Sequence, residues 1–208
     1  MKRLVAVLAL TAAALAAAPR ITYIKSFPKS TPAYVEIRVE QGGQAQYREA
    51  TDDESPLLFE LTPEERDGIF DLAAKLDRFT RPLESSLKVA FTGTKTFRWE
   101  DGNQKHEVQF NYSQDPVAQQ MWDWFERITE TELRRITLER AARFDKLGVN
   151  QALLQLQAVH ERNRLVAGSQ FLPVLDRISK NESYIHMARA RAASLAEAIR
   201  KSSSQASQ

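Results

Sequence analysis

The clearest alternation of hydrophobic and polar side chains lies in residues 34–40, where aliphatic residues alternate with charged ones. This period of two predicts a strand with one buried face. Gly42 and Gly43 follow directly and can adopt the positive φ of a tight hairpin turn. We therefore expect a return strand over residues 44–49 and a further short extended segment over residues 57–61.

A second pair of strands is predicted over residues 88–99 and 105–112. An Asp-Gly-Asn sequence lies between them, and large hydrophobic side chains share one parity on each strand. The two strands are therefore expected to form a hairpin with one aromatic-rich face. His106 falls on the apolar parity near a strand end, where we expect a structural, hydrogen-bonded histidine.

The first helix is predicted from the signal at its start. Thr62 suits the N-cap, Pro63 the first helical position, and Glu65 the position three residues after the cap. Apolar residues then recur at helical spacing. We expect a helix over residues 63–76 that packs on the sheet.

Residues 121–128 read MWDWFERI and contain two of the three tryptophans. On a helical wheel the apolar residues of residues 117–128 occupy one arc of about 160°, and the polar residues occupy the opposite side. This pattern is typical of a helix packed on a sheet, so the aromatic residues are expected in the core. Trp122 and Trp124 lie at the two margins of the arc and are expected to stay partly exposed.

The apolar arc changes position after Thr129. Glu132 and other charged residues fall where the apolar residues had been. A rotated apolar face is then formed by Leu133, Ile136, Phe144 and Leu147. Either the helix ends near Thr129 and restarts, with Thr129 and Glu132 in a second capping box, or it continues with its apolar side toward a different neighbour. Both interpretations place an architectural boundary here.

The remaining chain is predicted to be helical, with interruptions at Gly148 and Gly168. The fold class is therefore α+β. A small antiparallel sheet of four to five strands packed by two helices is expected over residues 19–129. An all-α segment of about three helices is expected over residues 130–201. The polar residues 202–208 are predicted to be a disordered tail.

Residues 1–18 match a secretory signal peptide. Lys2 and Arg3 precede an uncharged, alanine-rich run over residues 4–18, and cleavage is expected near Ala16. The run is shorter than the roughly 20 apolar residues of a membrane-spanning helix. We therefore expect a secreted or periplasmic protein with no stable membrane span after cleavage.

The composition excludes disulfide bonds and thiolate sites, because the chain has no cysteine. Charge is distributed unevenly. Residues 19–129 carry 14 basic and 19 acidic side chains, whereas residues 130–208 carry 13 basic and 8 acidic ones. The two halves are therefore expected to attract one another, or the basic half to face an anionic surface.

Motifs for catalysis are missing from the sequence. His106, His160 and His186 fall in different predicted elements, and no H-E-x-x-H zinc arrangement occurs. There is no phosphate-binding glycine loop and no G-x-S-x-G nucleophile elbow. We therefore predict that the protein is not an enzyme and has no catalytic, cofactor-binding or metal-binding residue.

A cluster of basic residues follows the proposed boundary. Acidic residues are interleaved with it, and an exported protein rarely meets nucleic acid, so a nucleic-acid partner is not expected. A solvated, salt-bridged helix face is favoured for the arginines. The candidate partner or interdomain surface consists of Trp122, Trp124, Arg134, Arg135, Arg140 and Arg143.

Residues 34–128 resemble emfourin, a family of small proteinaceous inhibitors of thermolysin-like metalloproteases such as protealysin. The resemblance rests on the order of strand, Gly42-Gly43 turn, strand, L-T-P-E-E helix start, hairpin and closing helix. It implies a compact α+β domain and inhibition by insertion of a loop into an active-site cleft. It identifies no reactive residue.

These observations predict an exported, non-catalytic protein that binds another extracytoplasmic protein or an envelope component. The alternative is an emfourin-like inhibitor of a thermolysin-like metalloprotease.

Overall fold

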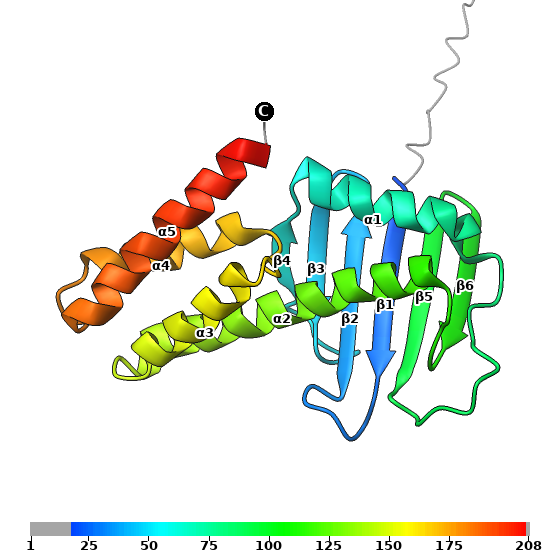
Figure 1. Cartoon of the computed structure of the whole chain (residues 1–208), viewed down its shortest axis with the longest axis horizontal. Helices are drawn as coiled ribbons and strands as arrows, with labels where there is room; N and C mark the ends of the chain where they lie inside the picture. The colour runs from blue at the N-terminus through cyan, green and yellow to red at the C-terminus, as the bar shows by residue number, and fades with distance from the viewer. Residues whose placement is uncertain (1–17, 207–208) are drawn as a thin grey trace, which may run out of the picture.

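The computed structural model describes residues 18–206 and shows a sheet with two covering helices beside a group of further helices (Figure 1). The strands are β1 (Arg20–Ser26), β2 (Tyr34–Glu40), β3 (Gln44–Arg48), β4 (Leu57–Glu60), β5 (Thr94–Asp101) and β6 (Gln104–Phe110). The α-helices are α1 (Pro63–Lys75), α2 (Pro116–Phe144), α3 (Val149–Glu161), α4 (Leu172–Lys180) and α5 (His186–Ala206). Two short 3-10 helices are η1 (Asp77–Phe79) and η2 (Gly168–Phe171). Apart from Ala18, the predicted signal peptide lies outside the described residues.

The α+β class is confirmed, but the predicted count of four to five strands is too low. The sheet has six antiparallel strands in the order β4-β3-β2-β1-β5-β6. The additional strand, β1, lies in the middle and pairs with β2 and β5. Ile21 and Tyr23 follow a period of two and are fully buried. Its alternation gave only a weak signal, because Ile24 and Lys25 interrupt it and the strand directly follows the alanine-rich run.

Strands β2, β3, β4 and β6 lie close to their predicted positions, whereas β5 starts at Thr94 and not at residue 88. The register explains the late start. Lys95 pairs with Phe110, so residues before Thr94 would need partners beyond the end of β6. After Phe110, however, the chain leaves the sheet and leads into α2, whose N-cap is Asp115. Residues 82–93 therefore form a loop without a strand partner.

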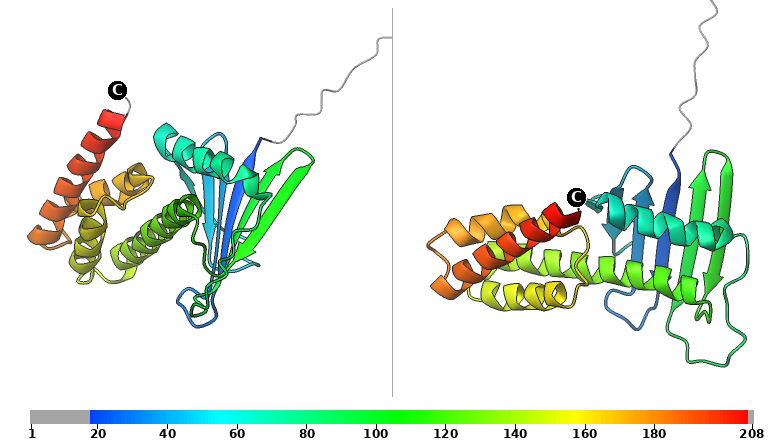
Figure 2. Two further views of the ribbon diagram at one scale, coloured as in Figure 1. Left: turned by 45° about the vertical axis from the view of Figure 1, so that its right-hand side comes forward. Right: turned by 45° about the horizontal axis from the view of Figure 1, so that its top comes forward.

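Helices α1 and α2 lie on the same face of the sheet, as predicted (Figure 2). Helix α1 begins with the expected capping box, in which Thr62 Oγ1 accepts from the Glu65 amide and Glu65 Oε2 accepts from the Thr62 amide. The first half of α2 buries Met121 and Phe125 completely in the core between helix and sheet. The MWDWFERI segment thus forms core, as its pattern predicted.

Helix α2 is continuous over 29 residues, so the interpretation in which it continues past Thr129 is correct and the restart is wrong. Its first half belongs to the sheet core. Its second half contributes Leu138 and Ala141 to a separate core with α3, α4 and α5. The expected boundary after Thr129 therefore falls inside one helix that contributes to both cores.

The rotated apolar face predicted for the second half of α2 is covered at Ile136, which packs against the sheet core, but not at its far end. Phe144 and Leu147 are 82% and 83% exposed, whereas Leu138 and Ala141 are buried. The helical wheel shows which residues of α2 share a face, but it does not show on which side the neighbouring helices pack. Helices α3 and α4 pack on the side of α2 that carries Leu138. Phe144 and Leu147, at the other end of the predicted face, therefore point to solvent.

The all-α segment predicted to hold about three helices contains the second half of α2 as well as α3, α4 and α5, so the predicted number is matched only approximately. The apolar residues that recur at helical spacing in α3 are all buried, namely Val149, Ala152, Leu153, Leu156 and Val159. Ile185 directly precedes α5, which starts at His186, and is exposed. Within residues 18–206, no helix is long and apolar enough to cross a membrane.

The tail predicted to be disordered is helical over residues 202–206, because α5 extends to Ala206. Ile199 is buried and anchors the preceding turn. The Ser202 hydroxyl donates to the Ile199 carbonyl at 2.9 Å. Alanine, serine and glutamine carry little helix penalty, so the helix can continue beyond its last packed turn.

Candidate functional site

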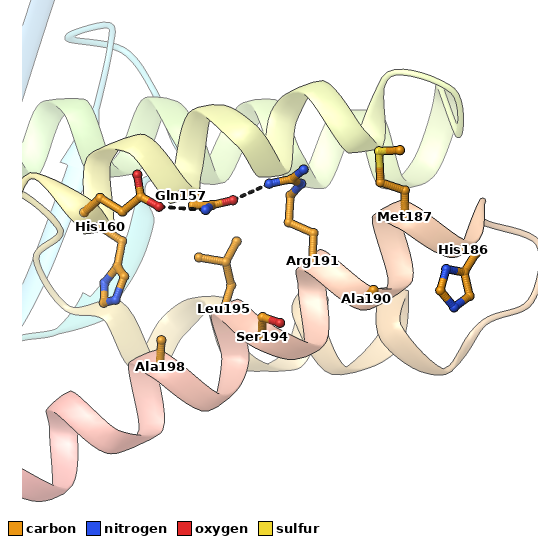
Figure 3. Close-up of a pocket in the computed structure, with 10 residues that line it drawn as sticks. Gln157, His160, His186, Met187, Ala190, Arg191, Ser194, Leu195 and Ala198 are labelled. Carbon is orange, nitrogen blue, oxygen red and sulfur yellow. Dashed lines mark hydrogen bonds between the residues drawn. The ribbon is translucent and has the colours of Figure 1, made fainter.

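The candidate site is an open groove between α3 and α5, with a volume of about 580 Å³ (Figure 3). It is larger than a second hollow, of about 270 Å³, that the end of α5 also lines. Its lining comprises Gln157, His160, Glu161, His186, Met187, Ala190, Arg191, Ser194, Leu195 and Ala198.

Small side chains of α5 form the base of the groove. Ala190, Ser194 and Ala198 are four residues apart and therefore share one face of the helix. Met187 and Leu195 add larger apolar surface beside them. This face leaves room for the backbone of another segment to approach α5 closely.

A chain of hydrogen bonds forms the polar wall of the groove (Figure 3). The Arg191 guanidinium donates to Gln157 Oε1, and Gln157 Nε2 donates to Glu161 Oε1 at 2.7 Å. Arg191 Nε also lies 3.4 Å from Asn150 Oδ1. These bonds link α5 to α3 and hold the Arg191 guanidinium in a defined position.

Two of the three histidines line this groove. His160 lies on α3, and His186 is the first residue of α5, at the other end of the pocket (Figure 3). His106 lies on β6, where it pairs with Trp99. Its Nδ1 atom is shielded and lacks a hydrogen-bond partner among the described residues, which contradicts the hydrogen bond expected for it. No cluster of three potential metal ligands occurs in residues 18–206.

Trp122 and Trp124 lie at the margins of the α2 face that packs on the sheet, where they are half-buried. The Trp122 indole N–H donates to Glu126 Oε1 at 2.9 Å, and Lys95 Nζ lies 4.6 Å from its ring centroid. The Arg127 guanidinium lies 4.3 Å from the Trp124 ring centroid. Both rings are thus engaged within the sheet half and do not line the groove.

Glu126 is the centre of a polar cluster between α2 and the sheet. Besides Trp122, its carboxylate accepts hydrogen bonds from the Tyr23 hydroxyl and Lys25 Nζ. Burial raises the pKa of the Tyr23 hydroxyl, and the nearby Glu126 carboxylate raises it further. Burial also lowers the pKa of Lys95, which lies beside this cluster. These groups are partnered by one another, so the cluster connects α2 to the sheet.

Arg134 and Arg135 both donate hydrogen bonds to other residues of the same chain. Arg134 Nη1 donates to Gln155 Oε1 on α3 at 2.7 Å. Arg135 Nη1 donates to the Leu58 carbonyl at 3.0 Å and to Gln170 Oε1 at 2.8 Å. Arg135 thereby connects β4 of the sheet half to η2 of the helical half.

Glu132 lies beside these arginines and is completely buried. Its Oε1 atom accepts from Gln170 Nε2 at 2.7 Å, and its Oε2 atom lies 3.5 Å from Arg135 Nη1. Burial raises the pKa of this carboxyl from its usual value near 4.5 to about 7. It is the most strongly perturbed carboxyl group described, but it lies in the interior and not in the groove.

The segment of residues 162–167 joins the two halves through charge and backbone contacts. Arg164 binds Asp123 and Glu130 on α2, both within 3 Å. The Val166 amide donates to Thr131 Oγ1 on the same helix. Val166 and the adjacent Ala167 are buried in the sheet core. Glu130 belongs to the basic half itself, so among these ion pairs the one with Asp123 joins the two oppositely charged halves.

Arg140 and Arg143 are exposed near the end of α2, away from the groove lining. The six residues predicted from sequence therefore do not form one surface. The groove residues were missed because a groove between two diverging helices depends on the packing of both. The only local signal for it was the spacing of Ala190, Ser194 and Ala198.

Comparisons with known proteins add no relative. No family model, no curated protein and no solved structure matches the chain.

Proposed function

We propose that the protein is a non-catalytic binding protein that holds an amphipathic helix of a protein partner in the groove between α3 and α5. The open groove, with small residues along α5 and a fixed polar wall, is the observation that supports this function most directly. Amphipathic helices bind such grooves by placing their apolar face on the base and their polar residues at the rim.

The charge of the groove indicates what the partner helix carries. The lining itself carries one guanidinium, Arg191, held by Gln157, and one carboxylate, Glu161, so the positive charge around the groove comes from the rest of the helical half. The segment of residues 130–208 has 13 basic and 8 acidic side chains. An acidic amphipathic helix complements this surface. The extracytoplasmic location expected from the first residues stays a prediction.

Filling the groove tests this function. Ser194 is exposed on the groove face of α5, so Ser194→Trp places a large ring in the hollow without disturbing the core. A partner captured by the wild-type protein from an envelope extract should bind this variant at least about tenfold more weakly, because the ring occupies the space of its helix. The affinity is measured by calorimetry with the purified partner.

Ala193→Trp is the matched control, because Ala193 is exposed on the same helix but lies outside the groove lining. It should retain wild-type affinity, and both variants should keep the wild-type circular dichroism spectrum. A partner that binds Ser194→Trp as tightly as the wild-type protein would show that the groove is not its site.

A second candidate function, inhibition of a thermolysin-like metalloprotease, is favoured by the loop of residues 82–93. Leu87, Val89 and Phe91 alternate along this loop and are all exposed. The loop is held on both sides of Leu87. Glu84 Oε2 accepts from the Asn111 amide at 2.6 Å, and Asn111 Nδ2 donates to the Ala90 carbonyl at 3.1 Å. A protruding apolar segment held in one conformation suits insertion into a protease cleft.

An assay of a thermolysin-like protease with excess protein tests this candidate. Inhibition is expected, and Leu87→Asp should relieve it because the carboxylate cannot enter an apolar subsite without losing its hydration. Ser194→Trp should inhibit like the wild-type protein. Full protease activity at a large excess of the wild-type protein would exclude inhibition.

A further inference from the structure

The end of the helical half furthest from the sheet is formed by two turns (Figure 1). One turn joins α2 to α3 and the other joins α4 to α5. The Tyr184 hydroxyl in the second turn donates to the Ala142 carbonyl near the end of α2 at 2.8 Å. Lys146 Nζ lies 6.0 Å from the Tyr184 ring centroid. The two turns therefore form one continuous surface, which we term the tip.

Large apolar side chains protrude from the tip. Phe144 and Leu147 in the first turn are 82% and 83% exposed, which makes them the most exposed large hydrophobic residues described. Ile185 and Met187, at the second turn, are also exposed. Single exposed apolar residues are ordinary, but a group of four on adjoining turns marks an interaction surface.

Cationic side chains surround these apolar residues. Arg140, Arg143 and Lys146 are exposed around the first turn, and Lys180 is exposed before the second. Acidic groups are fewer. Asp145 Oδ1 accepts a hydrogen bond from the Gly148 amide at 3.0 Å, and Glu182 is exposed in the second turn. The tip therefore combines an apolar centre with an excess of positive charge.

We propose that the tip docks on the surface of an anionic lipid bilayer. Phe144 and Leu147 enter the boundary between headgroups and acyl chains, and Arg143 and Lys146 lie at the level of the lipid phosphates. Apolar insertion combined with attraction to anionic lipids is how proteins attach to a bilayer surface without spanning it.

The shape of the tip favours a bilayer over a protein partner. Phe144 ends α2 and Leu147 lies in the turn to α3; they are 82% and 83% exposed, and neither lines any of the hollows described in residues 18–206. A protein partner would need a matching pocket for each side chain, whereas a bilayer accepts a projecting apolar group anywhere on its surface. Met187 belongs to both the tip and the groove lining, but this inference rests on Phe144 and Leu147, which lie outside that lining.

Sedimentation with lipid vesicles tests the proposal on the full chain. The wild-type protein should sediment with vesicles of phosphatidylcholine mixed with phosphatidylglycerol and should stay in solution with phosphatidylcholine alone. High salt should weaken binding, because it screens the attraction between cations and lipid headgroups. Failure to bind anionic vesicles at low salt would overturn the proposal and would point to a protein as the partner of the tip.

Two double variants separate the apolar and electrostatic contributions. Phe144→Ser with Leu147→Ser should weaken binding to anionic vesicles by at least about tenfold, because two apolar side chains no longer leave water. Arg143→Gln with Lys146→Gln should also weaken it by at least about tenfold, because each cation near an anionic surface contributes to attachment. Unchanged binding by either variant would contradict the proposal.

The matched control is Leu58→Ser with Phe91→Ser, which removes one leucine and one phenylalanine that are exposed in the sheet half. It should bind vesicles like the wild-type protein, and equal loss in the control would show that the tip is not the docking surface. Phe144→Trp supplies an independent readout. Its added tryptophan emission should shift to shorter wavelength on anionic vesicles, and an unshifted signal would overturn insertion of the tip.

Discussion

Glu132 is a carboxylic acid that folding places completely out of water, at the point where α2 passes from the sheet core to the helical core. Gln170 gives it one good hydrogen bond, but the Arg135 guanidinium is 3.5 Å from its other oxygen. Burial therefore outweighs these contacts and raises its pKa to about 7. A carboxyl whose pKa is raised by folding binds its proton more tightly in the folded state than in the unfolded state.

The free energy of unfolding should therefore carry a contribution from Glu132 that is fully present below about pH 4.5 and is lost as the pH rises to about 7. Its size is at most about 3.5 kcal/mol, since the pKa rises from 4.5 to about 7 and one pKa unit corresponds to about 1.4 kcal/mol. Glu132→Gln keeps an acceptor for Gln170 and should remove this contribution. Urea denaturation of both proteins across this pH range measures the difference.

Glu139→Gln is the control for this prediction, because Glu139 also binds Arg135 but is partly exposed. It should leave the pH dependence of stability close to that of the wild-type protein. If the stability difference between the wild-type protein and Glu132→Gln is the same at all pH values, Glu132 does not have the raised pKa.

At the start of α1, the Glu65 side chain takes part both in the local helix cap and in a contact with a distant segment. Glu65 Oε2 accepts from the Thr62 amide and completes the capping box. Glu65 Oε1 accepts from the Ala167 amide at 3.0 Å, in the segment that returns from the helical half. The glutamate therefore satisfies two backbone donors, whereas the Thr62 side chain satisfies one.

Glu65→Ala should consequently cost more stability than Thr62→Ala. Loss of the threonine cap should lower the free energy of unfolding by about 1 kcal/mol. Loss of the glutamate should lower it by about 2 to 3 kcal/mol, because it leaves two backbone amides without partners, one of them on the buried residue Ala167. Thermal and urea denaturation check both values. Equal costs would mean that the contact with Ala167 contributes nothing.

The whole molecule has two hydrophobic cores that share one helix and are joined a second time by residues 162–167. Val166 is buried in the sheet core although it follows α3 of the helical half. The covalent connection through α2 and the packing of residues 162–167 into the sheet core together favour unfolding as a single cooperative unit. The fluorescence of the three tryptophans reports on the sheet half, because Trp99, Trp122 and Trp124 all lie there.

Unfolding followed by tryptophan fluorescence and by far-ultraviolet circular dichroism should therefore give coincident transitions in the wild-type protein. Val166→Asp should separate them, with the fluorescence transition at lower urea, because an unpaired carboxylate in the sheet core costs about 3 kcal/mol or more. Ser169→Asp lies nearby on an exposed position and should keep the transitions coincident. Separate transitions in the wild-type protein would show that the halves unfold independently.

The sequence pattern correctly predicted those elements whose start or buried face is defined by residues close together in the chain. The alternation in β2, the capping box of Thr62 and Glu65, and the apolar arc around Phe125 all appear in the structure. The margins of that arc correctly placed Trp122 and Trp124 as half-buried. The periodicities of strand and helix are local properties of the backbone, so these features follow from neighbouring residues.

The sequence by itself determined the α+β class, most element positions and the opposite charges of the two halves. Only the tertiary structure decided that β1 is the central strand, that α2 runs through both cores, and that Glu132 is buried. The same holds for the groove between α3 and α5 and for the joining of two turns into the tip. Each of these depends on which distant segments pack together, and a periodicity shows that a face is apolar without showing what will cover it.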